Sequence, residues 1–380
     1  MSKQKKRKKR KKPAGVVLFS IIVLVITAFV VFRFEALAGN AWDLSSSGSG
    51  LTGSIPADYK VGYEDQTVFH IEEGYVLKTG DDVIRFYDTS AEPVWEKDLN
   101  GQNVLVDGNK KSISVVNQTA GDLFLLNTDG AITAKKFGVG QIGEVLHPSS
   151  DVLVCYMVEE NELRIFDAGL ENIARIPMPD GEILDLDVSS TDSLIAVSMF
   201  RLEDETYHSQ ILTYQLDGQA IGAINMKDKI ILDIEVVGTQ MIGVTDEQAF
   251  AYNTSNELLW DIDIDRTIKK ASVSKDGMIL LNLVRSSEDL TDTRPENALQ
   301  YINAKGEEVN EIAIEYDAEV MIFKDSRTVF STEDRLYILS NSGKMESIID
   351  TGGNLRSFNF ISEKYLGVEF GDRLDILKMD

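Results

Sequence analysis

Tyr87-Asp-Thr-Ser-Ala-Glu-Pro-Val-Trp95 and Tyr252-Asn-Thr-Ser-Asn-Glu-Leu-Leu-Trp260 are near-copies of one another within a chain of 380 residues. Each stretch joins the end of one apolar segment to the start of a second through an Asp or Asn turn. The same strand–turn–strand pattern recurs along the sequence, with turn residues at Asp88, Asn127, Asp167, Asp217, Asn253, Asn303 and Asn341. An eighth copy, 373–380, ends where its turn would begin. The chain is therefore a repeat protein with a period near forty residues.

Each repeat contains four short segments that read as strands. In the second repeat these are 103–107, 112–117, 122–127 and 131–136, which are rich in β-branched residues and are separated by Gly, Asn and Asp. No long amphipathic helix interrupts the pattern. A period near forty with four strands per unit is typical of a β-propeller blade. The sequence predicts an all-β, eight-bladed β-propeller, with seven blades as the alternative.

The eighth repeat supplies only three strands, within 355–360, 365–370 and 374–378. An open fourth edge would be available for pairing with other chains. Upstream of the first repeat, the strand-like segment Tyr59–Tyr63 has no other partner in the pattern. We predict that this segment completes the last blade and closes the ring.

The N-terminus has the composition of a signal anchor. Nine Lys and Arg residues lie between Lys3 and Lys12, and an apolar run without charges follows from Ala14 to Phe32. This run is close to the roughly twenty residues with which a helix crosses a bilayer. The positive-inside rule predicts a cytoplasmic tail (1–13), a transmembrane helix (14–34) and an extracytoplasmic remainder. The alternative is cleavage after Ala36-Leu37-Ala38, which resembles a signal-peptidase site and would release the protein.

A Ser/Gly-rich stretch, Ser45–Ser54, separates the apolar run from the first repeat. Such a composition is typical of a flexible linker. We therefore predict a tether at 35–57 and the propeller at 58–380.

Charge divides sharply along the chain. Ten of the 38 Lys and Arg residues, but none of the 62 Asp and Glu residues, lie within residues 1–34. The predicted extracytoplasmic part is therefore strongly acidic. Such a surface repels polyanions, so nucleic-acid binding is excluded as a function class.

The two near-copies resemble the repeat of quinoprotein-like and WD40-like propellers, in which a Trp on the outer strand packs against the neighbouring blade. Trp95 and Trp260 occupy this position, whereas other repeats have Lys135, Arg175 and Asn310 or their neighbours there. The overall layout also resembles an uncharacterised membrane-anchored propeller family of Gram-positive Firmicutes. This resemblance implies a bacterial cytoplasmic membrane and surface exposure, and it implies no activity.

Quinoprotein enzymes bind their redox cofactor with a vicinal Cys pair and a divalent cation. This chain has one cysteine, Cys155, within an apolar run that reads as a buried strand. The three histidines, His70, His147 and His208, fall in different repeats, without the spacing of zinc ligands. We predict no cofactor and interpret each histidine as a packed or surface residue.

The acidic residues include one alternating run. Asp261, Asp263 and Asp265 alternate with two Ile residues, which places the three acids on one face of a strand. They are weak candidates for a divalent-cation site, and the alternative is a charged, solvated blade edge. Asp185 and Asp187 present the same choice on a strand predicted to lie nearer the channel.

Two repeats are about ten residues longer than the others, and both are expanded between their second and third strands. The insertions are 199–208 and 285–296. Because equivalent connections of a propeller emerge on one face, both insertions should lie around the same end of the channel. Cationic and aromatic residues on this acidic surface are candidates for partner binding, and they are Arg201, Tyr207, His208, Arg285 and Arg294. The alternative is that both insertions are surface elaborations without a partner.

These patterns predict a non-catalytic interaction scaffold for cell-envelope proteins or wall polymer. The first alternative is an extracellular glycan-acting enzyme with a carboxylate cluster in the channel, and the second is a ligand-binding envelope sensor. Predicted channel-lining strands such as 103–106 and 319–323 are mostly apolar. This composition disfavours the enzyme.

Overall fold

The computed structural model describes residues 49–57, 67–80, 83–98, 104–118, 120–149, 151–189, 194–203, 206–285, 293–324, 327–340 and 342–379. All of them belong to the compact unit Ser47–Asp380. Within these ranges no helix is long and apolar enough to cross a membrane. The predicted basic tail and transmembrane helix lie outside them.

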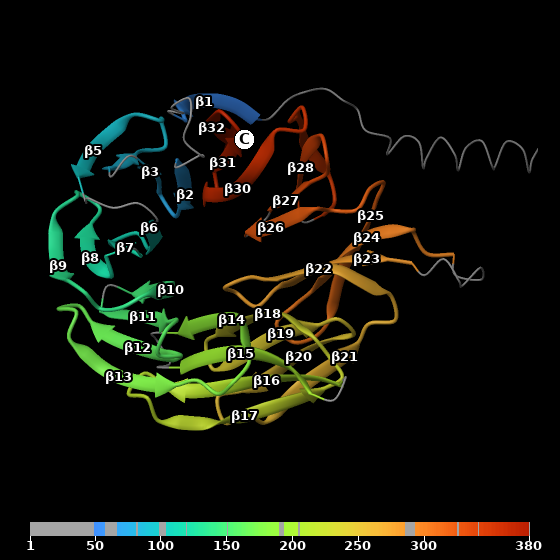
Figure 1. The fold of residues 1–380 in the computed structure, drawn as a ribbon. Coiled ribbons are helices and arrows are strands. Elements are labelled where there is room, and N and C mark those ends of the chain that lie inside the picture. Colours follow the sequence, from blue (N-terminus) through green and yellow to red (C-terminus); the bar gives the residue numbers. More distant parts are fainter. Residues whose placement is uncertain are drawn as a thin grey trace, which may run out of the picture. The chain divides into compact units, whose positions relative to one another are not determined.

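The described residues form 32 strands in eight antiparallel sheets of four strands each. The sheets follow one another around a ring (Figure 1), and we number them as blades 1 to 8. Blades 1 to 4 comprise β2–β5 (Val68–Glu72, Tyr75–Gly80, Val83–Tyr87, Pro93–Asp98), β6–β9 (Val104–Gly108, Ser112–Asn117, Asp122–Asn127, Ile132–Lys136), β10–β13 (Ile142–Ser149, Val152–Met157, Glu162–Asp167, Asn172–Pro177) and β14–β17 (Glu182–Ser189, Leu194–Glu203, Thr206–Gln215, Ala220–Lys227).

Blades 5 to 8 complete the ring. They comprise β18–β21 (Ile231–Val237, Gln240–Thr245, Gln248–Asn253, Leu258–Asp263), β22–β25 (Thr267–Val273, Ile279–Val284, Asn297–Ile302, Glu308–Ile314), β26–β29 (Val320–Lys324, Arg327–Ser331, Arg335–Ser340, Met345–Asp350) and β1 with β30–β32 (Ser49–Pro56, Leu355–Ser362, Tyr365–Phe370, Arg373–Met379).

The core lies between the blades. Each described hydrophobic cluster joins two successive blades, and one of them joins Ile55 and Leu374 of blade 8 to Phe69 and Val76 of blade 1. The middle strands are buried on both faces and are therefore nearly continuous apolar runs. The prediction of an all-β, eight-bladed propeller is confirmed, and the seven-bladed alternative is wrong.

The repeated turn has a simple chemical basis. The carboxylate of Asp88 accepts hydrogen bonds from the backbone N–H groups of Ser90 (2.8 Å) and Glu92 (3.1 Å). Asp or Asn makes the same pair of bonds at the start of the turns in blades 3, 5 and 6. In blades 4 and 7 the equivalent positions are Gln215 and Ser340. The predicted turn marker Asp217 is therefore out of register with the repeat, and Asn341 lies outside the described residues.

The two tryptophans join neighbouring blades, as their resemblance implied. The indole N–H of Trp95 donates to the Thr128 carbonyl (2.9 Å), and that of Trp260 donates to the Ala304 carbonyl (3.1 Å). Gly306 has φ of +79°, and a Cβ there would lie 2.8 Å from the Trp260 ring. Where a Trp packs against the turn of the next blade, the turn residue that faces the ring therefore has to be Gly.

In other blades the residue at the outer-strand position of Trp95 and Trp260 is smaller. The strand register, with its bulge, places Ala134 and Ala174 there, one residue before the expected Lys135 and Arg175. Asn310 lies at this position in blade 6, as predicted.

Ring closure occurs in the predicted manner but with a different strand. β1 pairs with β32 from Ser49↔Met379 to Pro56↔Arg373 and is the outer strand of blade 8. The predicted closing segment, Tyr59–Tyr63, lies outside the described residues. The closing strand instead comes from the Ser/Gly-rich stretch, so the predicted boundary between tether and propeller at 57/58 is wrong.

The composition of β1 suits an outer strand that touches the next blade. Ile55 is fully buried, whereas Leu51 is 62% exposed. A Cβ on Gly53 would lie 2.7 Å from the Cβ of Ala91, in the turn of blade 1. Ser54 donates to the Asp375 carboxylate (2.5 Å). β1 therefore needs small residues in order to lie against the turn of blade 1. The same Ser/Gly composition is also typical of a flexible linker.

Candidate functional site

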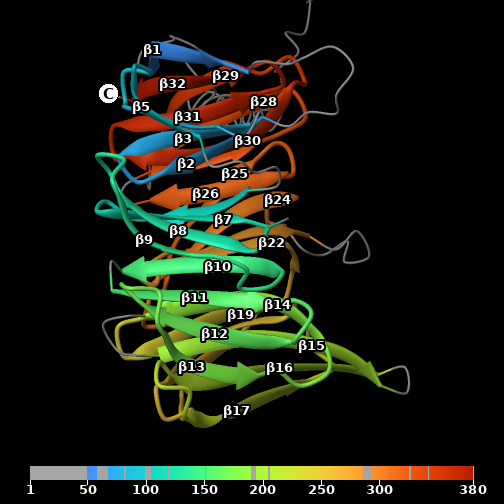
Figure 2. The same ribbon diagram turned by 60° about the vertical axis from the view of Figure 1, so that its left-hand side comes forward.

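The first insertion lengthens two strands rather than adding a loop. β15 and β16 have ten residues each, and Arg201 and Leu202 pair with His208 and Tyr207 near the tip of their hairpin. Figure 2 shows this hairpin extending outward at one side of the ring. Tyr207 is 47% exposed and Leu202 is 61% exposed, and the Tyr207 ring lies 5.8 Å from the ring of Phe200. The hairpin therefore exposes one cross-strand pair of large side chains, Leu202 and Tyr207, just before its last pair, Glu203 and Thr206.

The second insertion places two predicted residues together. The guanidinium of Arg285 donates to the backbone carbonyl of Arg294 (2.9 Å). Arg294 in turn donates to both carboxylate oxygens of Asp265 (2.8 and 3.0 Å), and this contact lowers the pKa of Asp265. Connections between second and third strands leave a propeller on one face, so this insertion and the hairpin share a face, two blades apart. No contact between the two insertions is present among the described residues.

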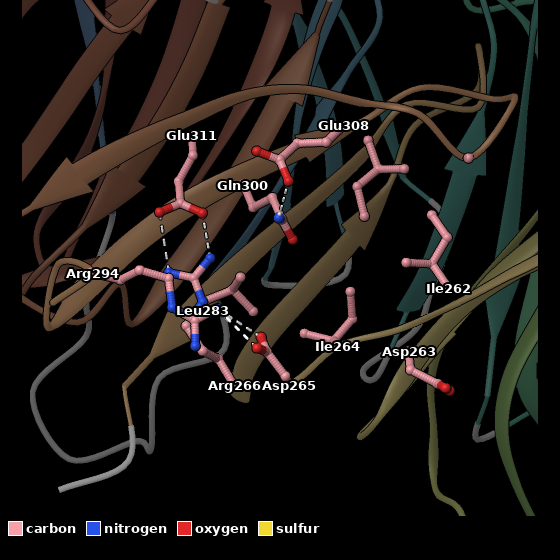
Figure 3. A pocket seen from close by; sticks show the side chains of 12 residues that line it. Ile262, Asp263, Ile264, Asp265, Arg266, Leu283, Arg294, Gln300, Glu308 and Glu311 are labelled. Carbon is pink, nitrogen blue, oxygen red and sulfur yellow. Dashed lines mark hydrogen bonds and ion pairs between the residues drawn. The ribbon is translucent and has the colours of Figure 1, made fainter. Parts of the chain in front are cut away.

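Arg294 lies at the edge of a pocket between blades 5 and 6, which we call the side pocket (Figure 3). Its volume is about 570 Å³, within the range of ligand-binding pockets. It is lined by Ile262, Asp263, Ile264, Asp265, Arg266, Leu283, Arg294, Gln300, Ile302, Gly306, Glu308 and Glu311. Four branched aliphatic side chains therefore adjoin a set of charged and amide groups.

The polar groups of the side pocket are only partly satisfied. Both terminal nitrogens of Arg266 donate to the Glu311 carboxylate, and the amide nitrogen of Gln300 donates to Glu308 (2.9 Å). Arg266 is only 6% exposed and Gln300 only 8% exposed. The Nε of Arg266 and the Oε1 of Gln300 have no hydrogen-bond partner in the described structure. One donor and one acceptor are thus buried and unused.

The first strands of blades 1 to 5 carry acidic residues among apolar ones, of which only Asp185 and Asp187 were singled out from the sequence. The residues are Glu72, Asp107, Glu144, Glu182, Asp185, Asp187, Asp233 and Glu235. Burial, followed by repulsion from neighbouring acids, raises the pKa of Glu72 and of Glu235 to about 8.

Four of these carboxylates connect neighbouring first strands. Asp185 accepts from the Ile234 N–H (2.8 Å) and Asp187 from the Val236 N–H (2.6 Å). Asp233 accepts from Val273 (2.6 Å), and Asp107 accepts from His147. A first strand is the inner edge of its sheet, so these backbone donors have no strand partner on that side. The carboxylates therefore hold the blades together.

Asp261, Asp263 and Asp265 are exposed, and the two intervening Ile side chains pack against the core between blades 5 and 6. No group of three or more His, Cys, Asp or Glu residues with metal-binding geometry occurs in the described part of the chain. His147 and Cys155 are buried, and burial lowers the pKa of His147 to about 4.

The sequence singled out Arg294 as a candidate for partner binding and Asp263 and Asp265 as candidates for a cation site, and all three line the side pocket. It did not single out Arg266, Gln300, Glu308 or Glu311, which also line it. Gln300 offered a usable signal, because it is a polar residue inside the apolar strand Ala298–Ile302. The other three offered none, since Arg and Glu are common on strand edges. Their proximity depends on how blade 5 meets blade 6.

Comparisons with known proteins identify the same fold. The chain resembles the solved structure of BamB from Moraxella catarrhalis at 11% identity, with 87% of this chain and all of BamB covered and a TM-score of 0.57. The C-terminal WD40 domain of Sif2 matches at 10% identity over 87% of this chain and 98% of that domain, with a TM-score of 0.61. No curated protein matches the chain in sequence. The model of a family of unknown function, DUF5711, matches residues 55–373.

Proposed function

Because this chain belongs to the DUF5711 family of unknown function, we propose a function from its own architecture: it is a non-catalytic interaction scaffold of the bacterial cell envelope. Its basic N-terminal tail and apolar run anchor it in the cytoplasmic membrane by a single helix. The propeller lies on the extracytoplasmic side and binds envelope proteins.

One observation carries the proposal: both long insertions place side chains beyond the core of their blades. The β15–β16 hairpin exposes Leu202 and Tyr207 beyond the blade core, and the other insertion contributes Arg294 to the edge of the side pocket. Exposed apolar side chains next to a polar rim are typical of protein interaction surfaces.

The glycan-acting enzyme is the weaker alternative. Such an enzyme needs two carboxyl groups that are available to the substrate. Four carboxylates on the first strands accept backbone N–H groups from the next blade. Their hydrogen bonds give these acids a structural role, which favours the scaffold.

The scaffold role is tested by proximity labelling from the propeller in the native host. The double variant Leu202→Ser/Tyr207→Ser should lose most of the proteins that the natural chain labels. Val94→Ser/Val309→Ser is the matched control, since these residues are 56% and 57% exposed on outer strands. Identical sets of labelled proteins for the two double variants would contradict the hairpin as the binding surface.

The orientation has a separate test. An epitope tag after the C-terminal Asp380 should be removed by protease added to intact cells stripped of their wall. A tag that is protected until the membrane is opened would place the propeller in the cytoplasm and contradict the proposal.

A further inference from the structure

The side pocket contains a buried donor and a buried acceptor without partners. The Nε–H of Arg266 and the Oε1 of Gln300 belong to side chains that are more than nine-tenths buried. In Figure 3 the Gln300 amide projects into the space enclosed by Glu308 and Ile264. A buried polar atom without a partner costs about 1–3 kcal/mol, and such atoms are rare in native structures. A ligand that supplies one acceptor and one donor would remove both penalties.

The apolar part of the side pocket sets the second requirement. Ile262, Ile264, Leu283 and Ile302 all line it, and Leu283 and Ile302 are almost fully buried. These side chains form an aliphatic surface beside the unsatisfied groups. A ligand that fits must place an aliphatic group within a few ångströms of its own donor and acceptor.

Charge sets the third requirement. Four carboxylates and two guanidinium groups line the side pocket. Arg266 pairs with Glu311, and Arg294 pairs with Asp265. Among the described lining residues, no cation remains to balance the exposed Asp263 and Glu308. The site therefore favours a ligand with a positive charge.

We propose that the side pocket binds an extended peptide segment in which an aliphatic residue adjoins a Lys or Arg. The peptide carbonyl accepts from Arg266 Nε–H, and a peptide N–H donates to Gln300 Oε1. The aliphatic side chain packs on the four lining Ile and Leu residues, and the basic side chain lies between Asp263 and Glu308. This inference rests on the proposed scaffold function and names the ligand class of that scaffold.

The lining favours a peptide over a glycan. None of the twelve described residues that line the side pocket is aromatic, whereas sugar rings commonly pack against aromatic faces. A sugar also presents many hydroxyl groups, but only two buried polar atoms of the pocket are without partners. Branched aliphatic side chains with one donor and one acceptor match a single peptide unit.

The test uses the full-length chain in detergent and an array of acetylated hexapeptides. The hexapeptides combine a central Leu, Ile or Ser with Lys, Gln or Glu at the adjacent position. Peptides with an aliphatic residue next to Lys should give the strongest signal, and Gln300→Leu should weaken binding at least tenfold. The double variant Asp263→Asn/Glu308→Gln should lose the preference for Lys but keep the preference for Leu and Ile.

The matched control is Asp261→Asn/Glu307→Gln, which removes the same charges from exposed residues that do not line the side pocket. It should bind as the natural chain does. Equal binding by the natural chain and Gln300→Leu, or no sequence preference on the array, would overturn the proposal. Binding of N-acetylglucosamine oligomers that Gln300→Leu abolishes would replace the peptide with a glycan and also overturn it.

The same variants separate this inference from the scaffold function. If Gln300→Leu retains all partners in proximity labelling while Leu202→Ser/Tyr207→Ser loses them, the scaffold stands and the side pocket is not its binding site. If neither variant changes the labelled proteins, both proposals fail.

Discussion

Neighbouring blades are connected by hydrogen bonds at contacts that we call joints. The joints and the side pocket contain the same kinds of residues, but they differ in how many of their buried polar atoms have hydrogen-bond partners. At the joints, Asp233 accepts the Val273 N–H (2.6 Å) and Trp260 donates to the Ala304 carbonyl (3.1 Å). In the side pocket, Arg266 Nε and Gln300 Oε1 are equally buried and have no described partner. Both regions are acidic and partly apolar. His147 Nδ1, at the joint between blades 2 and 3, is also buried without a described partner, so the side pocket is distinguished by two such atoms beside an aliphatic surface. This combination identifies the side pocket as a site.

Acidic residues on a propeller channel therefore do not by themselves indicate catalysis. The edge strands around the channel have free backbone donors, and a carboxylate on the neighbouring strand is a suitable acceptor. A binding site differs because its buried polar groups await a partner from outside the chain.

The largest expected effect concerns the closing joint. Ile55→Ala should lower the free energy of unfolding by about 2–5 kcal/mol, because the side chain is fully buried between blades 8 and 1. Leu51→Ala, on the same strand but 62% exposed, should change it by less than about 0.5 kcal/mol. Chemical denaturation measures both. Equal effects would show that β1 does not close the ring.

A matched pair within blade 6 distinguishes a joint from the site. Asn282→Leu should cost about 1–3 kcal/mol, because the Asn282 amide oxygen accepts the Ala318 N–H (3.3 Å) and its loss leaves that donor buried. Gln300→Leu should stay within about 0.5 kcal/mol of the natural chain, because the lost amide hydrogen bond to exposed Glu308 is offset by removal of a buried acceptor that is already unsatisfied. A larger loss for Gln300→Leu than for Asn282→Leu, measured by denaturation, would reverse the assignment of the two residues.

A smaller effect is the pH dependence of stability that arises from the buried acids of the first strands. Burial, followed by repulsion from neighbouring acids, raises the pKa of Glu72, Asp233 and Glu235 to about 8 in the folded chain, from 4.5, 3.8 and 4.5. Between these values the folded state holds more protons than the unfolded state, so stability decreases as pH rises. One pKa unit corresponds to about 1.4 kcal/mol, so the change from pH 5.5 to 8.5 should be on the order of a kcal/mol or more per group.

Melting temperatures across this pH range check the prediction. Glu235→Gln should flatten the profile, because it removes one of the three buried acids. A natural chain whose melting temperature rises towards pH 8.5 would contradict the assignment of these carboxyls as buried acids.

Much of the fold could be predicted because repeats constrain one another. The Asp88 and Asn253 turns, the two tryptophans and the truncated eighth copy predicted the blades, their joints and the mode of closure. The closing strand was misassigned because Gly53 reads as a linker residue, although its contact with Ala91 requires the absence of a side chain.

The candidate site was less predictable. Arg294 could be selected as a cation in a long insertion, and Asp265 as part of an alternating run. Arg266 and Gln300 come together only when the end of β21 lies against β24, and the unpaired state of their atoms depends on that packing. Burial without a partner is a property of three-dimensional structure and leaves no pattern in the sequence.

The most direct test of the side pocket as a peptide site is the NMR signal of the Gln300 side-chain amide, assigned by its loss in Gln300→Leu. Addition of an acetylated hexapeptide with adjacent Leu and Lys should shift this signal in proportion to occupancy, because the peptide N–H donates to Gln300 Oε1. A signal that stays in place while the peptide is bound would show that the buried acceptor is not used, and it would contradict the account.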